Sequence, residues 1–131
     1  MKIRLPIIEQ IESSGNPKAE NKASGARGLC QITKICLDDY NLTHPKKKIA
    51  WDAMFDPYLN RLVAAWYLFE RLPHFFKVFE IPHTLENYLF AYNAGTRTLR
   101  KYLQKEIGMP EETRKYIISY KEKLIGLIKP V

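Results

Sequence analysis

The sequence contains few of the features that mark membrane, metal-binding or disulfide-rich proteins. Among its 131 residues there is no apolar run long enough to span a bilayer. Its two cysteines, Cys30 and Cys36, lack the neighbouring His–Cys ligand set of a zinc site. Six residues apart on one helix they would point to different faces, so a disulfide would require a broken helix. We interpret both as buried thiols and expect neither a metal nor a cofactor.

The N-terminal segment lacks the residue pattern of a secretory signal peptide. Lys2 and Arg4 precede an apolar stretch, but Glu9 interrupts that stretch after a few residues. We therefore expect either export by another route or release of the chain from a longer precursor.

Strand-like alternation, internal repeats and linker-like segments are also missing. Hydrophobic residues make up 46% of the chain, which indicates a globular protein with a real core. The remaining periodicity is helical, so we predict one all-α domain over residues 1–131.

Helix signals recur along the chain. Leu5, Ile8 and Ile11 form one stripe that ends at Gly15. Asp56-Pro57 is a strong helix start, and the apolar run behind it predicts a central, mostly buried helix that ends near Pro73. Four further segments complete the prediction: a helix over about 27–39 with Leu29, Ile32 and Cys36 inward, one over 85–92 closed by Gly95, an amphipathic one over 96–107 with Leu99 and Leu103 inward, and a last one from Pro110 with Tyr116, Tyr120, Leu124 and Leu127 as its stripe.

The formal net charge of +7 predicts attraction to polyanions in general. Nucleic acid, anionic lipid and cell-wall polymer all fit this charge. The run Lys46–Lys48 is equally consistent with a solvated loop. Because no basic recognition helix of a known type is present, we expect no nucleic-acid partner.

Glu12 is the candidate for chemistry, because it follows an apolar helix and precedes a glycine-rich turn. A carboxyl in such surroundings is held away from water, which disfavours its charged form and keeps a proton available near neutral pH. A lone glutamate near an N-terminus is more often a surface residue, so the surrounding pattern has to decide.

Four short motifs supply that pattern. In this order and spacing they resemble those of the lytic transglycosylases of the soluble, goose-lysozyme-like type, whose pattern is Glu-Ser, Gly-Ala-x-Gly-Leu-Met-Gln, Ala-Tyr-Asn-Ala-Gly and Glu-Thr-Arg-x-Tyr-Val. The resemblance spans residues 5–117. The motifs of this chain are Glu12-Ser13, Gly25-Ala26-Arg27-Gly28-Leu29-Cys30-Gln31, Ala91-Tyr92-Asn93-Ala94-Gly95 and Glu112-Thr113-Arg114-Lys115-Tyr116-Ile117.

The resemblance implies a lysozyme-like helical domain that cleaves the glycan strands of peptidoglycan and acts as a monomer, without stable membrane insertion. Members break the β-1,4 bond between N-acetylmuramic acid and N-acetylglucosamine and leave a 1,6-anhydro end. On this analogy Glu12 is the single catalytic acid and then the base. The substrate contacts implied by the motifs are Ser13, Cys30, Gln31, Tyr92, Asn93 and Tyr116, the last through a hydroxyl that hydrogen-bonds the catalytic glutamate.

Several of these positions have a plainer alternative. Gln31 would otherwise lie on a helix surface, Asn93 would cap its helix, and Tyr116 would pack in the core. Three departures from the family pattern also matter. Cys30 replaces the usual methionine, Thr96 follows Gly95 where proline is frequent, and the segment 21–24 replaces the common Ser-Pro, so that its substrate-contacting side chain is not identified.

Two other functions compete with the transglycosylase. A hydrolytic goose-type muramidase needs an acid to activate water, yet the only other acid between Glu12 and Gln31 is Glu20, and no aspartate occurs there. A wall-binding module without catalytic activity would not need a catalytic glutamate such as Glu12. The setting stays open among a phage lysis protein of the endolysin kind, a tail or secretion machine, and a truncated periplasmic enzyme.

Overall fold

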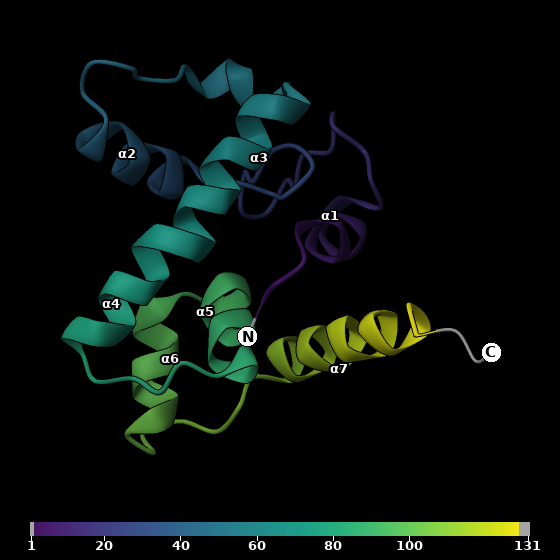
Figure 1. Cartoon of the computed structure of the whole chain (residues 1–131), viewed down its shortest axis with the longest axis vertical. Coiled ribbons are helices and arrows are strands. Elements are labelled where there is room, and N and C mark those ends of the chain that lie inside the picture. The colour runs from purple at the N-terminus through teal and green to yellow at the C-terminus, as the bar shows by residue number, and fades with distance from the viewer. Residues whose placement is uncertain (1, 129–131) are drawn as a thin grey trace. The chain divides into compact units, whose positions relative to one another are not determined.

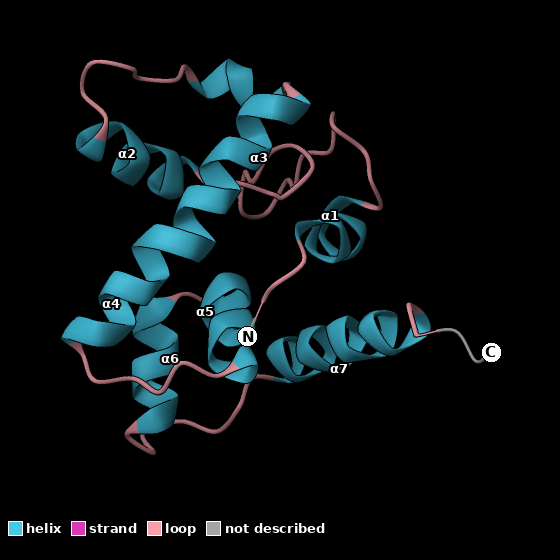
Figure 2. Cartoon of the chain, in the orientation of Figure 1, coloured by secondary structure: helices cyan, strands magenta, loops and turns pink. Residues whose placement is uncertain are grey.

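A computed structural model of the chain describes residues 2–128, which form helices joined by turns and loops (Figures 1 and 2). Within that range there is no strand, and the all-α prediction is confirmed. The chain divides into two compact units, each described by itself below. The N-terminal unit is Arg4–Arg71, and the C-terminal unit is Leu72–Val131 with Met1–Ile3.

The helices of the N-terminal unit begin at the capping residues that helix chemistry favours. Thr33 accepts a hydrogen bond from the backbone N–H of Cys36, and Asp56 accepts one from that of Leu59 at 2.9 Å. Pro57 then occupies the first helical position. The elements of this unit are α1 (Leu5–Ser13), α2 (Lys34–Thr43), the 3₁₀ helix η1 (Trp51–Phe55), α3 (Pro57–Trp66) and the π turn η2 (Tyr67–Arg71).

The core of the N-terminal unit joins α2, η1, α3 and the turn before α2. Its fully or almost fully buried members are Leu29, Cys30, Ile32, Leu37, Tyr40, Met54, Val63, Ala64 and Trp66. Leu5 of α1 packs against this cluster from the side. The turn that carries the second motif and the helix α2 that follows it are therefore built on one hydrophobic cluster.

The C-terminal unit contains α4 (Leu72–Val78), α5 (Leu85–Ala94), α6 (Thr96–Leu103) and α7 (Glu111–Gly126), with α5 packed against both α6 and α7 (Figure 1). Thr84 caps α5 by accepting from the N–H of Asn87 at 3.1 Å. Gly95 has a φ of 90°, which lets the chain turn directly from α5 into α6. The predicted helix at 85–92 thus exists and is two residues longer.

The predicted helix over 27–39 is wrong in its first half, since α2 begins only at Lys34. Arg27 and Ile32 instead form an antiparallel bridge, with N–H to carbonyl distances of 3.0 and 2.9 Å in the two directions. Gly28 and Gln31 have φ values of 80° and 55°, which a right-handed helix cannot contain. Leu29 and Ile32 are nevertheless buried, as expected, because the turn faces the core.

The predicted end of the central helix near Pro73 is also wrong, since α4 continues to Val78. Proline has no N–H to donate and its ring crowds the preceding helical turn. The wider turn η2 directly before α4 relieves this crowding. The helix is also less buried than predicted, because Leu62 and Phe69 are 39% and 47% exposed.

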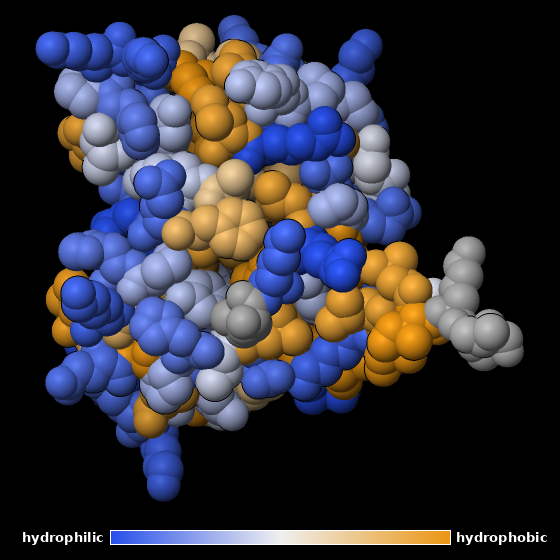
Figure 3. Space-filling view, in the orientation of Figure 1, coloured by the Kyte–Doolittle hydropathy of each residue, from blue (hydrophilic) through white to orange (hydrophobic). Residues whose placement is uncertain are grey.

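Near the C-terminus one helix ends earlier than predicted, and apolar side chains of two helices are more exposed than predicted. α6 ends at Leu103, which is 39% exposed, and Lys105 follows with a φ of 62°. In α7 the buried stripe includes Tyr116 and Tyr120 but does not reach Leu127, which is 57% exposed. Hydrophobic side chains consequently gather on the surface at the end of α7 (Figure 3).

In residues 2–128 no helix has the length and apolar character of a membrane span.

Candidate active site

Glu12 lies in the last turn of α1, half-buried, where the helix is terminated immediately behind it. Ser14 adopts a left-handed conformation with a φ of 55°. Its N–H donates to the carbonyl of Gln10 at 3.0 Å, and the N–H of Gly15 donates to that of Glu9 at 3.4 Å. The chain therefore turns away directly after Glu12, and the glutamate stands at the helix end.

Ser13 ties this helix end to the second motif. Its hydroxyl is 2.8 Å from the carbonyl oxygen of Leu29 and 3.1 Å from that of Glu9, and it donates to these acceptors. The bonded residues are sixteen positions apart in the sequence, and the first two motifs are thereby brought into direct contact. Ser13 was predicted as a substrate contact, and its bonds show that it also positions the helix end that carries Glu12.

Gln31 closes the turn that follows. Its side-chain amide nitrogen donates to the carbonyls of Gly28 at 3.0 Å and Ala19 at 3.3 Å. The alternative of a helix-surface glutamine is therefore excluded by the turn. The amide group holds the loop 19–31 together, and the Gln31 side chain is half-buried there.

Gly28 lies where the turn packs closely against η1 and α3. A Cβ atom at this position would lie 2.2 Å from the carbonyl oxygen of Met54 and 2.3 Å from Nδ2 of Asn60. This close approach requires glycine. Gly25 has a φ of 76° with open space around it, so its requirement is conformational alone.

Asn60 is a residue that the sequence reasoning missed. Its side chain is fully buried in α3, where it accepts from the N–H of Cys30 at 2.8 Å. Its amide nitrogen donates to the carbonyls of Arg27 and Met54, both at 2.9 Å. One asparagine thus fastens the second motif to α3 and η1. Its polar side chain within an otherwise apolar run was the available signal.

Cys30 lies inside the core and not on an open surface. It is 0% exposed, and burial raises the pKa of its thiol to about 12. The nearby carboxylates of Glu9 and Glu12 raise this pKa further, and Arg61 opposes them. Glu12 is therefore close enough to Cys30 for its charge to act on the thiol. Cys30 was predicted as a substrate contact, and the structure places it in the core of the N-terminal unit instead.

Arg27 organises the outer side of the same turn. Its guanidinium pairs with Glu20 at 3.1 Å and with Asp52 at 3.0 Å, and it lies over the rings of Trp51 and Phe55 at 4.4 and 4.8 Å. The arrangement links the glycine-rich loop to η1. Glu20 is exposed and held in this ion pair.

The segment 21–24 is shaped by its own polar side chains. Asn21 Oδ1 accepts from the N–H groups of Ala23 and Ser24 at 2.9 and 3.0 Å, and Ser24 Oγ accepts from that of Ala26 at 3.2 Å. Asn21 and Ser24 therefore replace the family's Ser-Pro as the groups that form the turn.

The other three predicted residues belong to the C-terminal unit. Tyr92 and Asn93 lie in the last turn of α5, and Tyr116 is buried on α7. Oδ1 of Asn93 accepts from the hydroxyl of the buried Thr113 at 2.8 Å. Asn93 thus locks α5 to α7 and does not act as the helix cap considered above. The third and fourth motifs meet within this unit.

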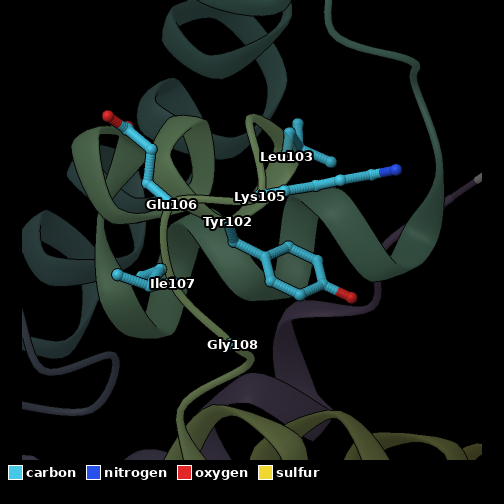
Figure 4. Close-up of a pocket in the computed structure, with 6 residues that line it drawn as sticks. All are labelled: Tyr102, Leu103, Lys105, Glu106, Ile107 and Gly108. Atoms are coloured by element: carbon cyan, nitrogen blue, oxygen red, sulfur yellow. The ribbon is translucent and has the colours of Figure 1, made fainter.

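A separate hollow of about 500 Å³ lies at the end of α6 (Figure 4). It is lined by Tyr102, Leu103, Lys105, Glu106, Ile107 and Gly108. None of the four motifs contributes to it, so the hollow is not a candidate for the chemistry. Among residues 2–128, moreover, no cluster of three His, Cys, Asp or Glu side chains could hold a metal ion.

Comparison with known families gives one match, in which the model of the Transglycosylase SLT domain covers residues 4–115. The match includes all but the last two residues of the four motifs and extends across both units. Searches of curated proteins and of solved structures found nothing that matches the chain.

Proposed function

Because the chain belongs to the Transglycosylase SLT domain family, a family of peptidoglycan-lytic enzymes, we propose that it is a lytic transglycosylase with Glu12 as its only catalytic carboxyl. It cleaves the β-1,4 bond between N-acetylmuramic acid and N-acetylglucosamine and forms a 1,6-anhydromuramic end. The observation that carries the proposal is the Ser13–Leu29 hydrogen bond, which joins Glu12 to the glycine-rich motif.

The reaction uses one carboxyl twice. Glu12 donates its proton to the glycosidic oxygen as the bond from C1 to that oxygen breaks. The resulting carboxylate then takes the proton of the C6 hydroxyl while the C6 oxygen bonds to C1. Glu12 regains its proton and no water is consumed. The N-acetyl group of the substrate stabilises the positive sugar between the two steps, as in substrate-assisted glycosidases.

The local structure supports this use of Glu12. Its helix ends directly behind it, and the hydroxyl of the adjacent Ser13 bonds to the Leu29 carbonyl of the glycine-rich turn. This bond fixes the backbone that carries Glu12, and general acid–base catalysis requires a positioned carboxyl. Backbone of the Gly28–Gln31 turn borders the same place.

The acids around this site support the non-hydrolytic reaction over the muramidase alternative. Inverting hydrolysis needs a second carboxylate to activate a water molecule. Glu20 and Asp52 are both held by Arg27, and Glu9 is held by Arg61. Each therefore has a structural partner to give up before it could act as the base.

The experiment compares Glu12→Gln with the matched variant Glu20→Gln on purified peptidoglycan. Glu12→Gln should lower turnover at least about 100-fold with an unchanged melting temperature, since the amide is nearly isosteric but exchanges no proton. Glu20→Gln should keep wild-type turnover. Mass spectrometry should find glycan ends lighter by one water than hydrolytic ends. Hydrolytic ends together with an inactive Glu20→Gln would establish the muramidase.

The remaining motif residues complete the proposal. We assign substrate contacts to Gln31, Tyr92, Asn93 and Tyr116, which retain the family pattern. Ser13 positions the end of α1 through its bond to Leu29, and Cys30 belongs to the core. The family match includes residues of both units. The enzyme acts on the bacterial wall, in phage lysis, in a wall-penetrating machine or in remodelling.

A further inference from the structure

One buried charge in the N-terminal unit has no place in the proposed mechanism. Glu9 lies on α1 and its side chain is only 11% exposed. Its two carboxylate oxygens accept from Nε and Nη2 of Arg61 on α3, at 2.9 and 3.0 Å. This is a two-point ion pair, the geometry in which arginine binds a carboxylate most specifically.

The pair belongs to the surroundings of Glu12. Glu9 and Glu12 are three residues apart on one helix, so their side chains are neighbours on the same face. Both act on the thiol of Cys30, together with Arg61. The charged and titratable groups that meet here therefore come from three elements: Glu9 and Glu12 from α1, Cys30 from the 27–32 turn, and Arg61 from α3.

We infer that Glu9 and Arg61 are positioning residues that balance the charge beside Glu12, so that this one carboxyl can serve first as an acid and then as a base. The inference rests on the proposed function, because it assumes that Glu12 must visit both protonation states in each turnover.

The balance follows from the sign of each charge. A carboxylate beside Glu12 disfavours its ionised form, and a guanidinium favours it. Glu9 alone would therefore make Glu12 a weaker acid in the first step, and Arg61 alone would make the Glu12 carboxylate a weaker base in the second. Cys30 contributes no charge of its own, since burial keeps the thiol neutral up to a pKa of about 12.

The test measures kcat/KM against pH with a short, peptide-free glycan of alternating N-acetylglucosamine and N-acetylmuramic acid. Activity should fall as pH rises through the titration midpoint of Glu12. Arg61→Gln leaves the Glu9 charge uncompensated and should move this midpoint upward. Glu9→Gln leaves the Arg61 charge uncompensated and should move it downward. A unit charge about 7 Å away, at an effective dielectric constant of about 30, corresponds to about one pH unit.

Three controls separate charge from structure. Arg61→Lys keeps the positive charge and should keep the wild-type midpoint. Arg71→Gln removes an arginine from another ion pair of the same unit, the one with Asp39 at 2.7 Å, and should not move the midpoint. The double variant Glu9→Gln with Arg61→Gln should return close to wild type. Since the Arg61 side chain is half exposed, Arg61→Gln decides the test even where Glu9→Gln fails to fold.

Opposite shifts in the two single variants would support the inference. Identical midpoints in wild type, Glu9→Gln and Arg61→Gln would overturn the inference. The ion pair would then only stabilise the contact between α1 and α3. Glu12→Gln is measured in the same assay, because activity in that variant would overturn the proposed function itself.

Discussion

Substitution of Gly28 by alanine should destabilise the protein far more than the same substitution at Gly25. Both glycines are left-handed, with φ values of 80° and 76°, so alanine incurs the same conformational cost of about 1–2 kcal/mol at either position. Only at Gly28 does the added methyl group meet other atoms, namely the Met54 carbonyl oxygen at 2.2 Å and Asn60 Nδ2 at 2.3 Å.

The additional loss at Gly28 can be worked out from what must move. To make room, the Asn60 amide and the Met54 carbonyl have to separate from the turn, which breaks or weakens the three hydrogen bonds of Asn60. Each buried hydrogen bond contributes about 0.5–1.5 kcal/mol net. The free energy of unfolding should therefore fall by about 3–6 kcal/mol in Gly28→Ala and by about 1–2 kcal/mol in Gly25→Ala.

Urea and thermal unfolding followed by circular dichroism measure this difference directly. For a chain of this size about 1 kcal/mol corresponds to roughly 3–5 °C, so the melting temperature of Gly28→Ala should be lower by more than about 10 °C. Equal losses in the two variants would refute the reasoning, because they would mean that the close approach to α3 and η1 does not constrain this turn.

Four further predictions address separate parts of the molecule. Asn60→Asp replaces the donating amide by an oxygen that faces two carbonyls, and should lower the free energy of unfolding by about 3–5 kcal/mol. The control Asn41→Asp, at a half-buried asparagine of the same unit, should lower the free energy of unfolding clearly less. Burial raises the pKa of both thiols, Cys30 and Cys36, to about 12, so alkylation at pH 8 should be on the order of a thousandfold slower in the native than in the unfolded protein; fast native labelling would show that the turn opens. Tyr116→Phe should lower kcat more than it lowers the melting temperature, and unchanged kcat with a large thermal loss would make Tyr116 a core residue alone. The +7 charge should make lysis of intact sacculi salt-sensitive, since screening limits surface charge to about 8 Å at physiological ionic strength; equal sensitivity with a short glycan would refute electrostatic capture of the wall.

The positions of several helices were predictable because their signals are local. The end of α1 and the caps at Asp56 and Thr84 depend on residues within one turn of each other, and the structure agrees at these places. The same locality explains the errors. A helical spacing of apolar residues over 29–36 is compatible with a turn followed by a helix, and only the Arg27–Ile32 bridge decides between them.

The site shows the same division between local and distant information. Glu12 and the glycine-rich motif were identifiable from residue types and their order, since the chemistry needs a carboxyl and a turn whose backbone lies close to it. Asn60, Arg27 and the Glu9–Arg61 pair were not identified, because their roles depend on partners 24 to 52 residues away. A buried asparagine and an exposed one look alike in a sequence.

By itself, the sequence determined the helical class, the family and the carboxyl proposed to react, since these depend on local propensity and on the order of short motifs. Only the tertiary structure decided why Gly28 must be glycine, that Cys30 lies in the core, and that Ser13 and Gln31 direct their hydrogen bonds into the turn. The physical reason is that hydrogen bonds and charges act across space, and a folded chain brings together groups that its sequence keeps apart.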